Sequence, residues 1–166
     1  MSSLSSTSAE LPAGHPDPSV TCFAATASED VAMHHRIRET VFVHEQGFFE
    51  GSDRDAHDED PVTVKVLATF GRVAGGAVRL YPLEERGLWK GDRLAVLPAF
   101  RPRNLGAHLV RFAVRTAGER GGELMVAHIQ LPNVSFFRRL GWHTVGDPIE
   151  YVGRTHQQMA IRLGPG

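Results

Sequence analysis

Two arginines and a glycine follow an apolar segment at the start of a predicted helix, and together they could bind an anion. The apolar residues 94–97 lead to Arg101 and Arg103, and Gly106 falls in the first turn of the helix. The first amide groups of a helix have no hydrogen-bond partner within it, and the helix dipole adds roughly half a positive charge there. Because Gly106 lacks a Cβ atom, a phosphate could approach these amides closely. The pattern predicts a binding site for a phosphorylated small molecule.

The composition of the chain argues against two classes of partner. With 18 basic and 19 acidic side chains among 166 residues, the chain lacks the basic excess that a general nucleic-acid-binding protein needs. No apolar run approaches the roughly 20 residues of a membrane-spanning helix. The single cysteine, Cys22, cannot form an intrachain disulfide and is typical of a reducing compartment. We therefore expect a cytoplasmic protein without nucleic-acid or membrane partners.

The length and residue pattern predict one domain preceded by a tail. Residues 1–19 are rich in Ser, Pro and Gly and are predicted to be disordered, whereas residues 20–166 are predicted to form a single domain. The adjacent Gly75 and Gly76 suggest a bulge or a close backbone approach. Apolar periodicity indicates helices at 28–44, 104–120 and 133–140 and strands at 20–26, 62–70, 73–80, 92–97, 123–130, 142–145 and 157–163.

The candidate anion site resembles the pyrophosphate-binding pattern of the GNAT superfamily of acyl-CoA-dependent N-acyltransferases. The family pattern is Arg or Gln, two residues, Gly, one residue, and Gly or Ala; here it reads Arg101-Pro102-Arg103-Asn104-Leu105-Gly106, with Asn104 in place of the first Gly. Asn133 and the run Phe136-Phe137-Arg138-Arg139-Leu140-Gly141-Trp142 extend the likeness to about residues 20–165. The resemblance implies an α/β fold with a mixed, mostly antiparallel twisted sheet of about six or seven strands. About three or four helices would flank this sheet, which would splay between its fourth and fifth strands.

A finer resemblance involves segments near both ends of the chain. Val41-Phe42-Val43-His44-Glu45-Gln46-Gly47, the acidic loop at 47–61 and His156-Gln157-Gln158-Met159 are similar to a subgroup of small bacterial GNAT proteins. Some members of this subgroup occur in nitrilase-associated gene clusters, and their N-terminal half is distantly similar to acyl-homoserine-lactone synthases. Lactone synthesis is the least favoured function that the resemblance suggests.

The resemblance implies an enzyme that transfers an acyl group, acetyl by default, from CoA to a small-molecule amine in a ternary complex. It implies no metal and allows a homodimer. A non-catalytic CoA-binding sensor or scaffold is the alternative, favoured by Asn104 and by Phe137, which stands where many members place a thiolate-protonating Tyr. Asn133 could also cap the helix at 133–140. The residues that the resemblance assigns to CoA are Leu94, Ala95, Val96, Arg101, Arg103, Asn104, Leu105, Gly106, Ala107, Asn133 and Phe136.

A transferase of this kind needs a base, because an ammonium group has no lone pair with which to attack a thioester. The candidates are His128 and Asp92, on the two strands expected to line the slot for the pantetheine arm, and Glu45 at the end of the first helix. Each has a structural alternative. His128 could pack on a strand face, Asp92 could pair with Arg93, and Glu45 could order the loop that follows.

The loop at 47–61 concentrates acidic residues, including Asp53, Asp55 and Asp58. A metal site is disfavoured, because transition-metal ligands must converge from fixed directions and an acidic loop is usually a solvated surface. Closely spaced like charges nevertheless cost free energy unless a counter-charge arrives. We hypothesise that this loop caps the acceptor pocket and favours a cationic amine.

Overall fold

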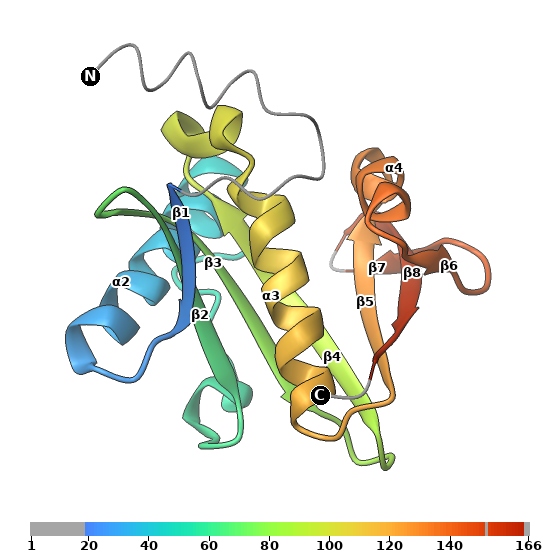
Figure 1. Cartoon of the computed structure of the whole chain (residues 1–166). Helices are drawn as coiled ribbons and strands as arrows, with labels where there is room; N and C mark the ends of the chain where they lie inside the picture. The colour runs from blue at the N-terminus through green and yellow to red at the C-terminus, as the bar shows by residue number, and fades with distance from the viewer. Residues whose placement is uncertain (1–18, 152, 165–166) are drawn as a thin grey trace. The chain divides into compact units, whose positions relative to one another are not determined.

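The computed structural model describes residues 19–151 and 153–164. Its strands form one sheet in the order β1-β2-β3-β4-β5-β8-β6, with β7 paired to β8 (Figure 1). Apart from Ser19, the tail predicted at 1–19 lies outside the described residues. The strands are β1 (Val20–Ala24), β2 (Val64–Phe70), β3 (Val73–Pro82), β4 (Leu88–Val96), β5 (Leu124–Gln130), β6 (His143–Thr144), β7 (Ile149–Tyr151) and β8 (Arg154–Arg162).

Helices of three kinds connect these strands. The α-helices are α2 (Ser28–Arg38), α3 (Leu105–Glu119) and α4 (Val134–Arg139). The π-helix η1 (Glu39–Glu45) continues α2, and the short 3₁₀ helices are η2 (Ala56–Glu59), η3 (Pro98–Arg103) and η4 (Leu131–Asn133). No helix among the described residues is long and apolar enough to cross a membrane.

The predicted fold class is confirmed. The sheet is mostly antiparallel, and β4 and β5 form a parallel pair whose register runs from Leu88–Leu124 to Lys90–Val126. The sheet has eight strands rather than six or seven, because β7 pairs with β8. This three-residue strand is too short for an alternating apolar pattern to reveal it.

The described residues form two compact units, each with a core of its own. Unit 1 contains the described part of Met1–Asp53, together with Lys65–Val78 and Arg93–Phe112. Unit 2 contains Arg54–Val64, Arg79–Asp92 and the described part of Ala113–Gly166.

The core of unit 1 is built around the apolar face of α2 and η1. Ile37 and Val41, which lie four positions apart in the predicted helix, are both buried. They belong to one hydrophobic cluster with Leu67 of β2 and Ala95 of β4, and Phe49 packs against this cluster from the loop after η1. The spacing of apolar residues thus fixes which face of the helix lies against the sheet.

The core of unit 2 depends on alternation along β5. Met125, Ala127 and Ile129 are buried, whereas the intervening residues, His128 among them, are half-buried. Every residue of β5 is paired with β8, which runs antiparallel to it and places Gln158 opposite His128. The period of two therefore assigns His128 to the less buried face of the sheet.

Two segments differ most clearly from the predicted boundaries. The helix predicted at 28–44 is α-helical only to Arg38 and continues as η1, where the Gln46 amide donates to the Val41 carbonyl. β4 begins at Leu88, earlier than the predicted position 92, because its first residues pair with β5.

Gly76 lies where a side chain approaches β3 closely, as the glycine pair suggested. A Cβ atom at this position would lie 2.8 Å from Leu109 Cδ1, so Gly76→Ala should destabilise the fold by about 1–3 kcal/mol through overpacking. Urea denaturation measures the change. The control is Gly164→Ala, where a Cβ atom meets nothing within 4 Å and a change within about 0.5 kcal/mol is expected. Equal stability of Gly76→Ala and the parent chain would contradict this prediction.

Candidate functional site

The start of α3 has the backbone shape that an anion site needs. Asn104 ends η3 with φ 61° and ψ 29°, a left-handed conformation that Asn adopts more readily than most residues. Leu105 and Ala107 are buried and anchor the first turn of the helix, and Gly106 between them is half-buried. The first amides of α3 thus follow a sharp turn and adjoin a residue without a Cβ atom.

Arg101 and Glu45, which were predicted for different roles, form one ion pair in unit 1. The guanidinium of Arg101 donates to both carboxylate oxygens of Glu45, at 2.7 and 2.6 Å, and its Nε donates to the Val96 carbonyl at 3.1 Å. The hydrogen bonds between them lower the pKa of Glu45 and raise the pKa of Arg101. Both side chains are exposed, so a ligand that competes for Arg101 has to displace Glu45.

The other unit 1 residues that were predicted to bind CoA lie on β4 and at the end of η3. Leu94 and Val96 are half-buried, and Ala95 between them is buried in the core of unit 1. The guanidinium of Arg103 lies over the Phe70 ring, 4.7 Å from its centroid. This contact holds the stem of Arg103 at the base of the η3–α3 turn.

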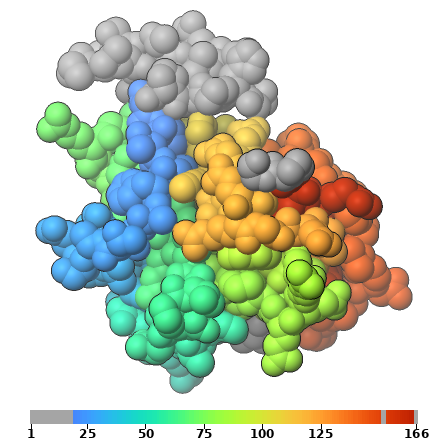
Figure 2. All heavy atoms as spheres, turned by 60° about the horizontal axis from the view of Figure 1, so that its bottom comes forward, coloured from blue at the N-terminus to red at the C-terminus, as the bar shows by residue number. Residues whose placement is uncertain are grey.

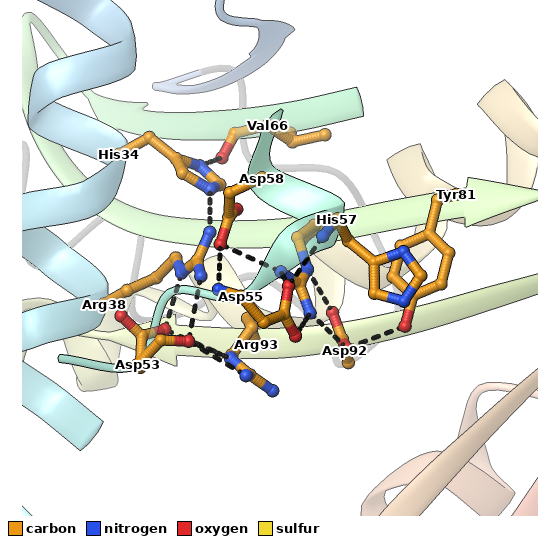
Figure 3. Close-up of polar contacts among 11 residues, drawn as sticks. His34, Arg38, Asp53, Asp55, His57, Asp58, Val66, Tyr81, Asp92 and Arg93 are labelled. Carbon is orange, nitrogen blue, oxygen red and sulfur yellow. Dashed lines mark hydrogen bonds and ion pairs between the residues drawn. The ribbon is translucent and has the colours of Figure 1, made fainter. Parts of the chain in front are cut away.

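A chain of hydrogen bonds crosses the interior of unit 1 (Figure 3). His34 Nδ1 lies 3.0 Å from the Val66 carbonyl, and Arg38 Nη1 lies 3.1 Å from His34 Nε2. Because a carbonyl only accepts and a guanidinium only donates, His34 is neutral with its proton on Nδ1. Arg38 Nε donates to Asp53 Oδ2 at 2.7 Å, and Arg93 Nε donates to the same oxygen at 3.1 Å. The chain therefore links β2, α2, the acidic loop and β4.

A second polar cluster in unit 2 surrounds Arg79, which is fully buried. Its Nε and Nη2 donate to Asp92 at 2.8 and 2.7 Å, and its Nη1 and Nη2 donate to Asp55 at 2.6 and 3.1 Å. Nη1 also donates to Asp58 at 3.0 Å, so all five N–H groups are bonded. Burial opposes the charge, yet the bonds to Asp92 and Asp55 raise the pKa of Arg79.

Most of the acidic loop is exposed, as expected of such a loop, but two of its carboxylates lie in the interior. Asp53 and Asp58 are buried, because Arg38 and Arg79 supply their counter-charges. Asp55 caps η2: its side chain accepts from the His57 amide at 3.0 Å, and its own amide donates to Asp58 at 3.1 Å. That the loop caps an acceptor pocket stays a prediction.

Around η2, an aromatic pair covers part of the Arg79 cluster. The His57 ring stacks on the Tyr81 ring, with centroids 3.8 Å apart and planes 14° apart. The Tyr81 hydroxyl donates to Asp92 at 3.3 Å, and burial together with Asp92 raises the pKa of Tyr81. Figure 2 shows the segment around η2, in teal, and the turn between β3 and β4, in lime, at the surface of unit 2.

His128 lies among titratable groups on the less buried face of unit 2. Lys90 of β4 lies opposite Val126 of β5, and Val126 precedes His128 by two positions. The side chains of Lys90, Val126 and His128 therefore share one face of the sheet. Burial lowers the pKa of His128, and Lys90 and His156 lower it further, whereas Asp92 raises it. His128 is consequently neutral at neutral pH, which is the protonation state that a general base requires.

The other residues of unit 2 that the sequence singles out differ in how far they are buried. Asn133 is exposed at the N-cap of α4 but makes no side-chain capping bond, so capping does not account for it. Phe137 is buried and packs edge-to-face on Trp142 at 5.3 Å, and Phe136 contacts it in the same way. His156 is buried, as expected of a core histidine.

Sequence reasoning missed the partners of the acidic residues. Asp92 pairs with Arg79 rather than with Arg93, and Arg93 pairs with Asp53. One signal was available: Arg79 stands in a nearly continuous buried run of β3, where an unpaired guanidinium is not tolerated. Among the described residues, no group of three His, Cys, Asp or Glu side chains is placed to hold a metal ion.

Comparisons with known proteins agree with this geometry. The sequence model of the Acetyltransferase (GNAT) family matches residues 26–142. A Bacillus subtilis (strain 168) protein provisionally named an acetyltransferase is 27% identical over 135 residues, covering 81% of this chain and 90% of that protein. A solved Lactobacillus plantarum protein, provisionally named an N-acetyltransferase, has a TM-score of 0.78 at 19% identity over 87% of this chain and 99% of that one. The CoA-dependent acyl-homoserine lactone synthase BjaI, solved with SAM and isopentyl-CoA, has a TM-score of 0.70 at 20% identity over 87% and 83%.

His34 should make the stability of the fold depend on pH. Burial lowers the pKa of His34 from 6.5 to about 3, despite its bond to the Val66 carbonyl. Between these pH values only the unfolded chain binds this proton, so the free energy of unfolding should fall by up to about 1.4 kcal/mol per pH unit on acidification. Urea denaturation from pH 7 to pH 5 measures the slope. His34→Gln should flatten it, and His44→Gln, at an exposed site, is the control. An unchanged slope in His34→Gln would refute the assignment.

Proposed function

Because the chain belongs to the acetyltransferase (GNAT) family, we propose that it transfers an acyl group from CoA to a small-molecule amine. Acetyl is the simplest donor group. The nitrogen lone pair attacks the thioester carbonyl carbon, a C–N bond forms, and the C–S bond breaks. A substrate ammonium loses two protons, one before the attack and one as the amide forms. One of them joins the thiolate and the other passes to water, so that an amide and free CoA result. Positioning the two reactants together supplies most of the catalysis in such a direct transfer.

The start of α3 carries this proposal, because its geometry suits the CoA diphosphate. The left-handed Asn104 turn opens the first amides of the helix, Gly106 leaves room beside them, and Arg101 and Arg103 supply positive charge just before the turn. The first turn of α3, from Leu105 to Ala107, would bind the diphosphate. The pantetheine arm would pair with backbone groups of Leu94, Ala95 and Val96 in unit 1. The CoA contacts of Asn133 and Phe136 stay predictions from the sequence.

His128 is the best supported general base among the three candidates. Both carboxylate oxygens of Asp92 accept from Arg79, and both carboxylate oxygens of Glu45 accept from Arg101. His128 is neutral and half-buried, as a base for an ammonium group has to be. Phe137 has no proton to give. We therefore propose that the imidazolium of His128 returns the proton to the thiolate.

A CoA-binding module without turnover is the second candidate. The burial of Phe137 against Trp142 favours it, because the position that often carries a proton donor is part of the core. Both candidates predict that CoA raises the melting temperature. Thiol release from acetyl-CoA with a panel of amines separates them: release supports the transferase, and none with any amine supports the module.

Replacing His128 should remove most of the activity without weakening donor binding. His128→Ala should lower kcat by about 10²–10⁴-fold while the KM for acetyl-CoA changes little, because the base acts only in the transfer step. His143→Gln is the matched control, because His143 is the exposed residue of β6. A His128→Ala variant with the parent kcat would eliminate this base.

The pH profile gives an independent test of His128. Activity should fall as the pH drops through the pKa of His128, which lies below 6.5. Because Lys90 lowers that pKa, Lys90→Met should move the acid limb of kcat/KM to higher pH. An acid limb that Lys90→Met leaves in place would point to another titrating group.

Glu45 should compete with the CoA diphosphate for Arg101. Glu45→Gln removes the competing charge and should tighten CoA binding a few-fold, whereas Arg101→Gln should weaken it. Isothermal titration calorimetry at two salt concentrations measures both effects. If Glu45→Gln weakens binding as much as Arg101→Gln does, Glu45 orients Arg101 instead of competing for it.

A further inference from the structure

Arg93 has a backbone conformation that its residue type disfavours. Its φ is 56°, within β4, and the other non-glycine residue with positive φ in the described part of the chain is Asn104. In this region the Cβ atom crowds the following carbonyl; the short polar side chain of Asn offsets that cost by bonding locally, whereas Arg has no such local compensation. Some other interaction must therefore hold Arg93 in place.

The side chain of Arg93 is clamped onto Asp53. Nε lies 3.1 Å from both the carbonyl oxygen and Oδ2 of Asp53, and Nη2 lies 2.9 Å from the same carbonyl. The guanidinium also lies over the Phe49 ring, 4.6 Å from its centroid. The side chain is only 11% exposed, so these contacts are little weakened by solvent.

Asp53 is itself held by a second arginine, which shares its Oδ2 with Arg93. It is buried and accepts from Arg38, which is fully buried and bonded in turn to His34. His34 is anchored to the Val66 carbonyl on β2 (Figure 3). The position of the Arg93 side chain is therefore set by the interior of unit 1.

The residues that follow Arg93 are those that the proposed function assigns to the pantetheine arm. Leu94, Ala95 and Val96 complete β4, and the dihedral angles of Arg93 set the direction in which they leave. Val96 also accepts from Arg101, so the same short segment leads to the diphosphate site. A change of φ at Arg93 would redirect these backbone groups together.

We propose that Arg93 is a positioning residue: its clamp on Asp53 holds the left-handed turn of β4 and thereby orients the donor-binding backbone of Leu94, Ala95 and Val96. This inference rests on the proposed function. It assigns no contact with the reacting atoms to Arg93. The side chain acts through its own backbone, so a residue that adopts positive φ without a clamp should replace it.

A substitution series at Arg93 separates this role from a role of its charge. Arg93→Gly, Arg93→Asn, Arg93→Ala and Arg93→Val all remove the guanidinium but differ in how easily they adopt positive φ. We expect acetyl-CoA affinity and kcat/KM to follow the order Gly, Asn, Ala, Val. Arg93→Gly should stay within about threefold of the parent chain, and Arg93→Ala should lose about tenfold or more.

The parent chain provides the reference for both measurements, which are calorimetric titration with acetyl-CoA and thiol release per folded molecule. Failure of the parent chain to bind acetyl-CoA would overturn the proposed function and this inference with it. Binding by the parent chain with equal losses in all four variants would overturn the inference alone, because charge would then be what matters. A ranking confined to melting temperature, with affinity and kcat/KM unchanged, would also overturn it and leave Arg93 purely structural.

Discussion

A buried guanidinium is tolerated only when carboxylates or other acceptors use its hydrogen-bonding groups, and each unit of this chain contains one such group. Arg38 in unit 1 and Arg79 in unit 2 are both fully buried. Asp53 satisfies the first, and Asp55, Asp58 and Asp92 satisfy the second. Removing one partner from such a pair costs several kcal/mol, whereas the intact pair adds little net stability. These arginines therefore fix geometry more than they add stability.

The same pairing decides which groups remain available for chemistry. Asp92 and Glu45 bond to guanidinium groups through both of their oxygens, and the carboxylates of the acidic loop are largely committed as well. His128 differs, because burial and neighbouring cations keep it neutral. The general base proposed here is thus the candidate that its surroundings keep uncharged. In unit 1, the Asp53 carboxylate that pairs with Arg38 also bonds to Arg93, so the buried charges and the shape of β4 are linked.

Much of the fold could be predicted from the sequence because it depends on local patterns. The four-residue spacing of Ile37 and Val41, the alternation along β5 and the strand–turn–helix at Asn104 all come from residues close together in the chain. The partners of Arg79 could not be predicted in the same way, since Asp55 precedes it by 24 positions and nothing local selects Asp55 over its acidic neighbours. The left-handed conformation of Arg93 was hidden for the same reason, because a distant carboxylate holds it. Boundaries failed where elements are short or irregular, as at β7 and η1.

The central claim is that the amides at the start of α3 bind a diphosphate. Titration calorimetry with CoA and, separately, with pantetheine tests it directly, because pantetheine lacks the diphosphate and the nucleotide. We expect CoA to bind and pantetheine to bind far more weakly. No heat of binding with CoA at millimolar concentration, or equal affinity for the two compounds, would contradict it.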